Sequence, residues 1–239
     1  MAMFGPYTGD PKKSVSYLYG PHWKGMKGYR VVEGISDYNH RFGGEKWKVP
    51  TCKNCGEKYH QIFSFDLNDE RLKELKIEGL VELPLISCLN CSTVWEPQLF
   101  KIDKNKKEVS VLINNDIHGF IQDIELRIPS PLPEVPVTLV DMKEEDIPID
   151  ETTYYEIFEI FGSEYLCRLI GAPLYIQSPI DRECPICHRE MNYVATIGSQ
   201  EFGKVDSLIS GVDFFLGEMF LYFLFCKYCS VLKTEVQGT

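Results

Sequence analysis

The chain has 239 residues, and its 35 Asp and Glu against 25 Lys and Arg give a formal net charge of −10. This acidic balance argues against a dedicated nucleic-acid binder, which normally carries a basic stripe or patch. The length corresponds to one large domain or two small ones, with enough chain to bury a core. No secretory leader and no apolar run long enough to cross a bilayer is recognisable, so we expect a cytoplasmic protein without membrane segments.

Residues 1–40 are rich in Gly, Tyr and Pro and are assigned only as an N-terminal segment. A first unit is predicted over 41–128, where a Gly-rich turn and "TCKNCG" (51–56) lead into a strand, "EKYHQIFSF". Next, "DLNDERLKELKIEG" predicts a short helix, because acidic residues and Asn precede leucines at helical spacing and Gly79 follows as a stop. A β-prone run then ends in the second cysteine pair, "LPLISCLNC" (83–91).

Two further segments of the first unit, "KEVSVLINND" and "IQDIELRIPSP", alternate apolar and polar residues and predict strands. Residues 129–160 are rich in proline and acidic residues, which predicts a connector followed by a short helix in "ETTYYEIFEIFG".

The second unit, predicted over 161–239, repeats the order of the first. It has "ECPICH" (183–188), a strand-like "REMNYVATI", a loop-like excursion and then "LYFLFCKYC" (221–229). Aligning Cys52 with Cys184 places Gly43 opposite Gly171, with four extra residues in the second copy. We therefore predict an α+β fold rich in β-structure, in which an internal duplication packs two zinc-knuckle-bearing halves as one body.

Eight of the nine cysteines form four Cys-x-x-Cys pairs, whereas random placement would give about 0.3 such pairs. This spacing lets a tight turn aim two sulfurs at one point, and two turns together make a tetrahedral thiolate site. Gly56 and Pro185 suit such turns. We expect two structural Zn²⁺ ions, one in each half. The predicted ligand sets are Cys52, Cys55, Cys88 and Cys91, and Cys184, Cys187, Cys226 and Cys229.

Several alternatives stay open for these cysteines. Ligands could pair across the halves, and iron suits a four-thiolate site as well. Disulfides and a redox pair are disfavoured, because the compartment is expected to be reducing and no pair begins a helix in a βαβ unit. Cys167 lies in "EYLCRLIG", where a buried, inert thiol is expected.

The search for a catalytic group yields few residues, and no sequence motif of a nucleophilic or phosphate-binding site is present. His60 and His188 lie near cysteine pairs, but we interpret them as core or solvated histidines. The carboxylates of Asp66, Asp213 and Glu218 also have ordinary structural interpretations. Two complete sets of four thiolates leave no open coordination position, which argues against zinc catalysis.

The arrangement resembles the YwqG-like family of uncharacterised bacterial proteins and, more distantly, the programmed cell death protein 2 family. The resemblance rests on a Gly-Gly-x-Pro-like turn and an aromatic residue ahead of a Cys-x-x-Cys, then a strand, then a second strand ending in Cys-x-x-Cys. "GAPLYIQ" (171–177) with "CPICHREMNYVATI" matches well, whereas "GGEKW" with "CKNCG" lacks the proline. It implies zinc knuckles on a duplicated β-rich fold, no established reaction, and a protein-binding role by analogy.

These observations predict a zinc-stabilised protein-interaction module that is an adaptor, chaperone-like or immunity-type protein. Its partner is expected to be a protein and basic, because opposite charge speeds encounter. One alternative is an enzyme with a cleft between the halves that does not use the cysteines. Another is a zinc-ribbon nucleic-acid binder. Lys46, Lys48, Lys53 and Lys58 surround the first cysteine pair, but we interpret them as solubilising residues.

Overall fold

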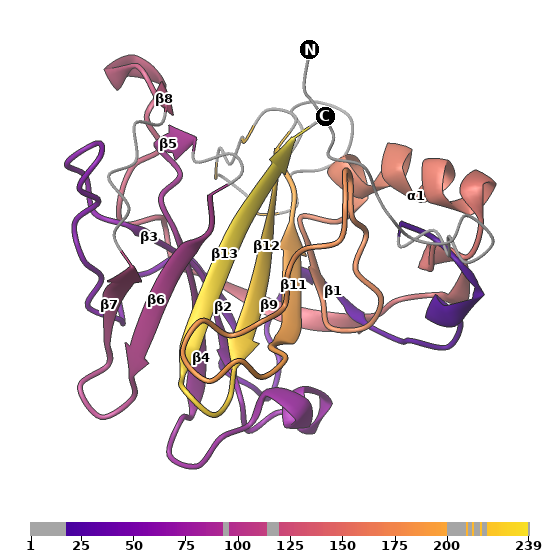
Figure 1. The fold of residues 1–239 in the computed structure, drawn as a ribbon, viewed down its shortest axis with the longest axis horizontal. Helices are drawn as coiled ribbons and strands as arrows, with labels where there is room; N and C mark the ends of the chain where they lie inside the picture. The colour runs from indigo at the N-terminus through magenta and orange to yellow at the C-terminus, as the bar shows by residue number, and fades with distance from the viewer. Residues whose placement is uncertain are drawn as a thin grey trace.

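In the computed structural model, the described residues are 18–92, 96–113, 120–199, 209, 212, 216 and 219–238. Eleven of their strands form one sheet in the order β4-β3-β2-β9-β1-β10-β11-β12-β13-β6-β7 (Figure 1). Two short strands, β5 (Cys91–Ser92) and β8 (Phe120–Ile121), pair separately. The β-rich part of the predicted fold class is therefore confirmed.

Two antiparallel meanders, each formed by strands in chain order, carry the cysteine pairs. The first consists of β2 (Arg41–Phe42), β3 (His60–Asp66) and β4 (Glu82–Ser87). The second consists of β10 (Cys167–Leu169), β11 (Asn192–Ile197), β12 (Met219–Cys226) and β13 (Val231–Gly238). Strands β3, β4, β11 and β12 are buried almost throughout, as their continuous apolar sequences require.

Two strands from outside the meanders join them. Strand β9 (Val135–Asp141) pairs with β2 on one side and with β1 (Tyr29–Glu33) on the other, and β1 in turn pairs with β10. The segment 129–160, predicted as a connector, thus also supplies a strand to the middle of the sheet. Pro136 lies opposite Arg41 in the short β2 pairing, while Val137 is fully buried.

The hairpin of β6 (Gln98–Asp103) and β7 (Glu108–Ile113) belongs to the first half in sequence but extends the second meander, since β6 pairs with β13. The sheet curls so that β4 also meets β13. There the Thr234 hydroxyl donates a hydrogen bond of 2.8 Å to the Ile86 carbonyl oxygen. The two halves are consequently joined within one sheet.

Strand β12 separates two apolar clusters. Leu221, Phe223 and Phe225 face the larger one inside the curl, and Tyr222 and Leu224 face the other. Helix α1 (Glu151–Glu164), at the predicted position, lies to the side of the sheet near β1 (Figure 1) and packs against the second cluster. It contributes the buried side chains of Tyr154 and Ile157.

Other elements differ from the sequence expectation. The predicted short helix is a 3₁₀ helix, η3 (Glu70–Leu75), and its N-cap is Asp69, whose side chain accepts a hydrogen bond from the Arg71 amide. The strand predicted over 121–131 is wrong for most of its length, because η4 (Ile124–Leu126) follows β8. Short 3₁₀ turns also form η2 (Pro21–Trp23) and η5 (Glu144–Asp146).

The excursion expected over 198–211 lies mostly outside the described residues. None of the described helices combines the length and the apolar character needed to cross a bilayer.

Candidate metal centres

The eight paired cysteines gather into two groups of four, each made from the two pairs of one half. In each group the four sulfur atoms lie within 4.8 Å of one another, and all nine cysteines of the chain are free thiols. The groups are Cys52, Cys55, Cys88 and Cys91 (the first centre), and Cys184, Cys187, Cys226 and Cys229 (the second centre). Each centre joins the turn before one strand to the turn after the neighbouring strand.

The sulfur positions match a tetrahedral metal site. Four sulfurs at about 2.3 Å from a central ion lie about 3.8 Å from one another. In the first centre the Sγ–Sγ distances are 3.9 Å for Cys52–Cys91 and 3.6 Å for Cys55–Cys88. In the second centre Cys187 and Cys226 are 3.6 Å apart. Both groups can therefore hold a metal ion through four thiolates.

The turn that carries the first cysteine pair of each centre, called here the leading turn, has the same backbone hydrogen bonds in both centres. The Gly56 amide donates to the Cys52 carbonyl oxygen and the His188 amide to that of Cys184, each at 2.9 Å. The amides of Cys52 and Cys184 both donate to the carbonyl oxygen five residues later, at 2.7 and 2.9 Å. Matching isolated bridges, 51 with 58 and 183 with 190, close the two turns.

The strands after these turns correspond as well. The pairing of β3 with β4 shifts register between Gln61 and Phe63, and that of β11 with β12 between Tyr193 and Ala195. Each irregularity thus falls at the same distance from its leading cysteine pair.

The Gly-rich turn ahead of each pair is also shared, with a change of one residue from the sequence alignment. The amides of Gly43 and Ile170 donate to Ile62 and Val194, both at 2.8 Å, and each begins a pair of residues with positive φ. By this geometry Gly171 corresponds to Gly44, and the second half has five more residues than the first between this glycine and its cysteines.

The turns that carry the second cysteine pair of each centre, called the trailing turns, have different supports. In the first, the Gln98 side chain accepts a hydrogen bond of 2.9 Å from the Cys88 amide, so β6 supports this turn. In the second, the ammonium group of Lys101, also on β6, donates to the Cys229 carbonyl oxygen. Strand β6 thus contacts both centres, from residues only three apart.

Hydrogen bonds and burial separate the thiol pKa values within each centre. In the first centre, hydrogen bonds from Cys88 and Cys91 lower the pKa of Cys52. The hydrogen bond between Cys88 and Cys52 in turn raises the pKa of Cys88. In the second, the Arg189 backbone amide helps to lower the pKa of Cys187 to about 7, whereas burial raises that of Cys229 to about 12. Binding a cation would displace the thiol protons and make all four sulfurs thiolates.

The two histidines near the centres have structural surroundings. His60 is fully buried, accepts a hydrogen bond at Nδ1 from the Leu89 amide and donates from Nε2 to the Ile128 carbonyl oxygen. Burial lowers its pKa, so it is neutral and supports the turn that carries Cys88. His188 is exposed and lies 2.6 Å from Glu183.

The other sequence candidates lie apart from the centres or outside the described residues. Asp66 ends β3 and accepts hydrogen bonds from the amides of Asn39 and Asn68. Asp213 and Glu218 are outside the described residues. Cys167 is fully buried in β10, which raises the pKa of its thiol well above the usual value, as expected of an inert cysteine.

A buried polar cluster that the sequence did not predict joins His40, Asp69 and Arg71. His40 donates a hydrogen bond of 3.0 Å to Asp69, and the Arg71 guanidinium also binds this carboxylate while packing over Tyr29 and Tyr38. The only sequence signal is the Asp69-x-Arg71 spacing at the start of a helix. His40 comes from a segment 29 residues away, so only the fold brings it there.

No family model, curated protein or solved structure matches the chain.

Proposed function

We propose that the protein is a zinc-stabilised protein-interaction module with one structural Zn²⁺ in each centre. The observation that carries this proposal is the presence of two closed groups of four cysteine sulfurs at tetrahedral spacing. Zn²⁺ is the ion favoured by four-thiolate sites of this geometry, and iron is the alternative that metal analysis would identify.

Closed coordination supports a structural role for the metal. A catalytic zinc ion keeps one position open for water or substrate, whereas four protein thiolates fill the tetrahedron. Each ion would instead fix the start of one strand against the end of its neighbour, β3 with β4 and β11 with β12. The proposal also includes descent of the two halves by duplication, which the shared turns and strand irregularities support.

The interaction surface that we propose lies at the tip of the second centre. Ile186 and Tyr228 occupy the middle of its two Cys-x-x-Cys turns and are 48% and 66% exposed. The Arg189 guanidinium lies 4.1 Å from the Tyr228 ring centroid. Exposed aromatic and Arg side chains on a rigid support are typical of residues that dominate binding energy in protein interfaces.

Kinship with the YwqG-like family, a basic protein partner and a cytoplasmic location remain parts of this proposal. The net charge of −10 supports a basic partner, through faster encounter at low salt.

The test is affinity capture from an extract of the source cell at low and at raised salt. Wild type is compared with Tyr228→Ala and with Tyr155→Ala, a matched control whose ring is 56% exposed on α1. We expect one basic protein to be retained by wild type and by Tyr155→Ala and lost from Tyr228→Ala. Equal capture by all three would contradict the proposed surface, and a hydrolytic activity without any specific partner would favour the enzyme alternative.

A further inference from the structure

A cavity of about 450 Å³ lies beside the first centre, outside the surface described above. Residues 44–49 form one wall, the β6–β7 turn another, and Ser130 and Pro131 a third. The first two walls are held together by backbone hydrogen bonds of 2.9 Å, from the Lys48 amide to the Lys107 carbonyl oxygen and from the Val109 amide to that of Lys48. Segments far apart in sequence therefore build this pocket.

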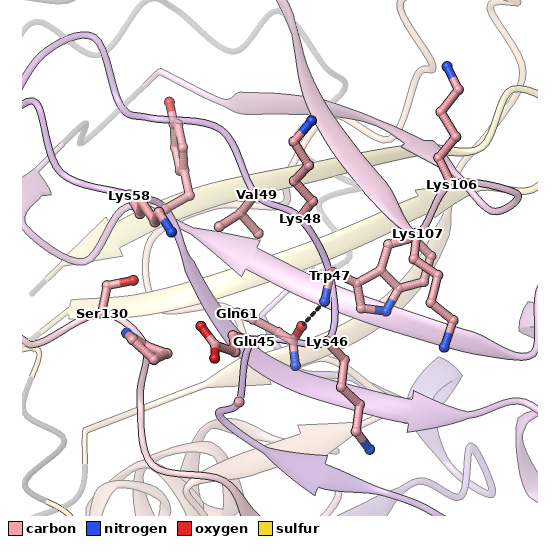
Figure 2. A pocket seen from close by; sticks show the side chains of 13 residues that line it. Glu45, Lys46, Trp47, Lys48, Val49, Lys58, Gln61, Lys106, Lys107 and Ser130 are labelled. Carbon is pink, nitrogen blue, oxygen red and sulfur yellow. Dashed lines mark hydrogen bonds between the residues drawn. The ribbon is translucent and has the colours of Figure 1, made fainter.

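The lining is strongly basic for an acidic protein. It contains five of the 25 Lys and Arg residues of the chain and only one of the 35 Asp and Glu residues, Glu45. Figure 2 shows the lysines surrounding Trp47 and Gln61. They are Lys46, Lys48, Lys58, Lys106 and Lys107.

The lysines of the pocket differ in whether a carboxylate already neutralises their charge. Lys48 pairs with Glu108 at 2.9 Å, and weaker pairs join Lys46 to Glu134 and Lys106 to Asp103. Within the described part of the chain, Lys58 and Lys107 are exposed and have no ion-pair partner. They come from different walls, so a ligand that contacts both needs more than one anionic group.

The polar groups on the floor of the pocket are already hydrogen-bonded to the protein. The Gln61 side chain accepts from the Trp47 amide at 3.2 Å and donates to the Gly43 carbonyl oxygen at 2.7 Å. Trp47 is 2% exposed, and its indole N–H donates to Glu82. Tyr59 is also buried. No aromatic face of this floor is open for stacking on a base, which disfavours single-stranded nucleic acid as the ligand.

We propose that this pocket binds a small phosphorylated sugar. Lysine ammonium groups are point charges that suit phosphoryl oxygens from several directions, and the volume lies in the range of small-molecule sites. Lys58 and Lys107 would bind the phosphoryl groups. Glu45 and the Ser130 hydroxyl, which line the same pocket, would bind sugar hydroxyls.

Isothermal titration calorimetry of the full-length, metal-loaded protein at about 0.15 M ionic strength tests this site. The probes are fructose 1,6-bisphosphate, glucose 6-phosphate, fructose and a single-stranded RNA octamer. We expect the bisphosphate to bind, the monophosphate to bind about tenfold more weakly because it reaches one lysine fewer, and fructose not to bind measurably.

The variant Lys58→Gln/Lys107→Gln should weaken bisphosphate binding by about tenfold or more, whereas Lys24→Gln/Lys73→Gln, two exposed lysines outside the pocket, should not change it. Lys58 lies near Cys55, so metal content is measured for each variant. Lys107→Gln alone decides if the double variant loses metal.

The proposal would be overturned by no binding of either phosphate, by equal binding in all variants, or by tighter binding of the RNA octamer through the same lysines. A loss of metal without a change in phosphate binding would also overturn it, because the lysines would then only balance the negative charge of the first centre.

Discussion

The residue after each leading cysteine pair has a left-handed backbone conformation. Gly56 has φ 78° and His188 has φ 58°. Glycine adopts this conformation freely, whereas a side chain there strains the backbone. The sequence predicted the turn at Gly56 from its glycine. It could not predict the same geometry at His188, because the hydrogen bond to Cys184 and the coordination demand of the turn override the local preference.

This difference predicts opposite effects of two substitutions. Gly56→Ala should lower the free energy of unfolding by about 1 kcal/mol, since an added Cβ meets no atom within 4 Å and only the backbone strain counts. His188→Gly should raise it, because strain is removed and only an exposed ion pair to Glu183 is lost. Urea denaturation of the metal-loaded proteins measures both. Destabilisation by His188→Gly would show that the strain is compensated elsewhere.

At the scale of elements, strands with continuous apolar sequences were predictable and strands placed by distant partners were not. The sequence 219–226 is apolar almost throughout, and β12 lies there. Strand β9 could not be predicted, because its prolines indicated a connector. Its place in the sheet depends on pairing with β1 and β2, which come from far earlier in the chain. The pairing of the β6–β7 hairpin with β13 could not be predicted either, because the local sequence of a strand does not specify a distant partner.

The position of the centres at strand ends predicts a local effect of metal removal. After chelation, hydrogen exchange should speed up in the turns 51–59, 183–191 and 226–231 and in the adjoining ends of β3 and β11. Exchange in β1, β9 and β10 should change little, since these strands are held by the sheet and not by cysteine turns.

Uniform exchange through the whole sheet after chelation would show that the metals are needed for the entire fold. Unchanged exchange in the turns would show that the turns form without metal.

At the scale of the whole molecule, one curled sheet of eleven strands carries, in each half, a group of four cysteines that can hold a metal ion. The sequence predicted both centres, because Cys-x-x-Cys spacing and the order of pairs are local signals. It could not predict their different surroundings. Cys52 and Cys88 belong to the apolar cluster inside the curl, whereas Cys184 and Cys226 belong to the second cluster, to which α1 contributes side chains. The sequence could not predict the basic pocket either, because two of its lysines come from the β6–β7 turn, far along the chain from the others.

The central claim is that each half closes its own four-thiolate metal site. Native mass spectrometry with elemental analysis, on protein purified without chelator, tests it most directly. We predict two zinc ions per chain in the wild type. Cys55→Ser and Cys187→Ser should each retain one ion, because they affect different centres. A wild type with one ion or none, or the loss of both ions from either variant, would contradict the account.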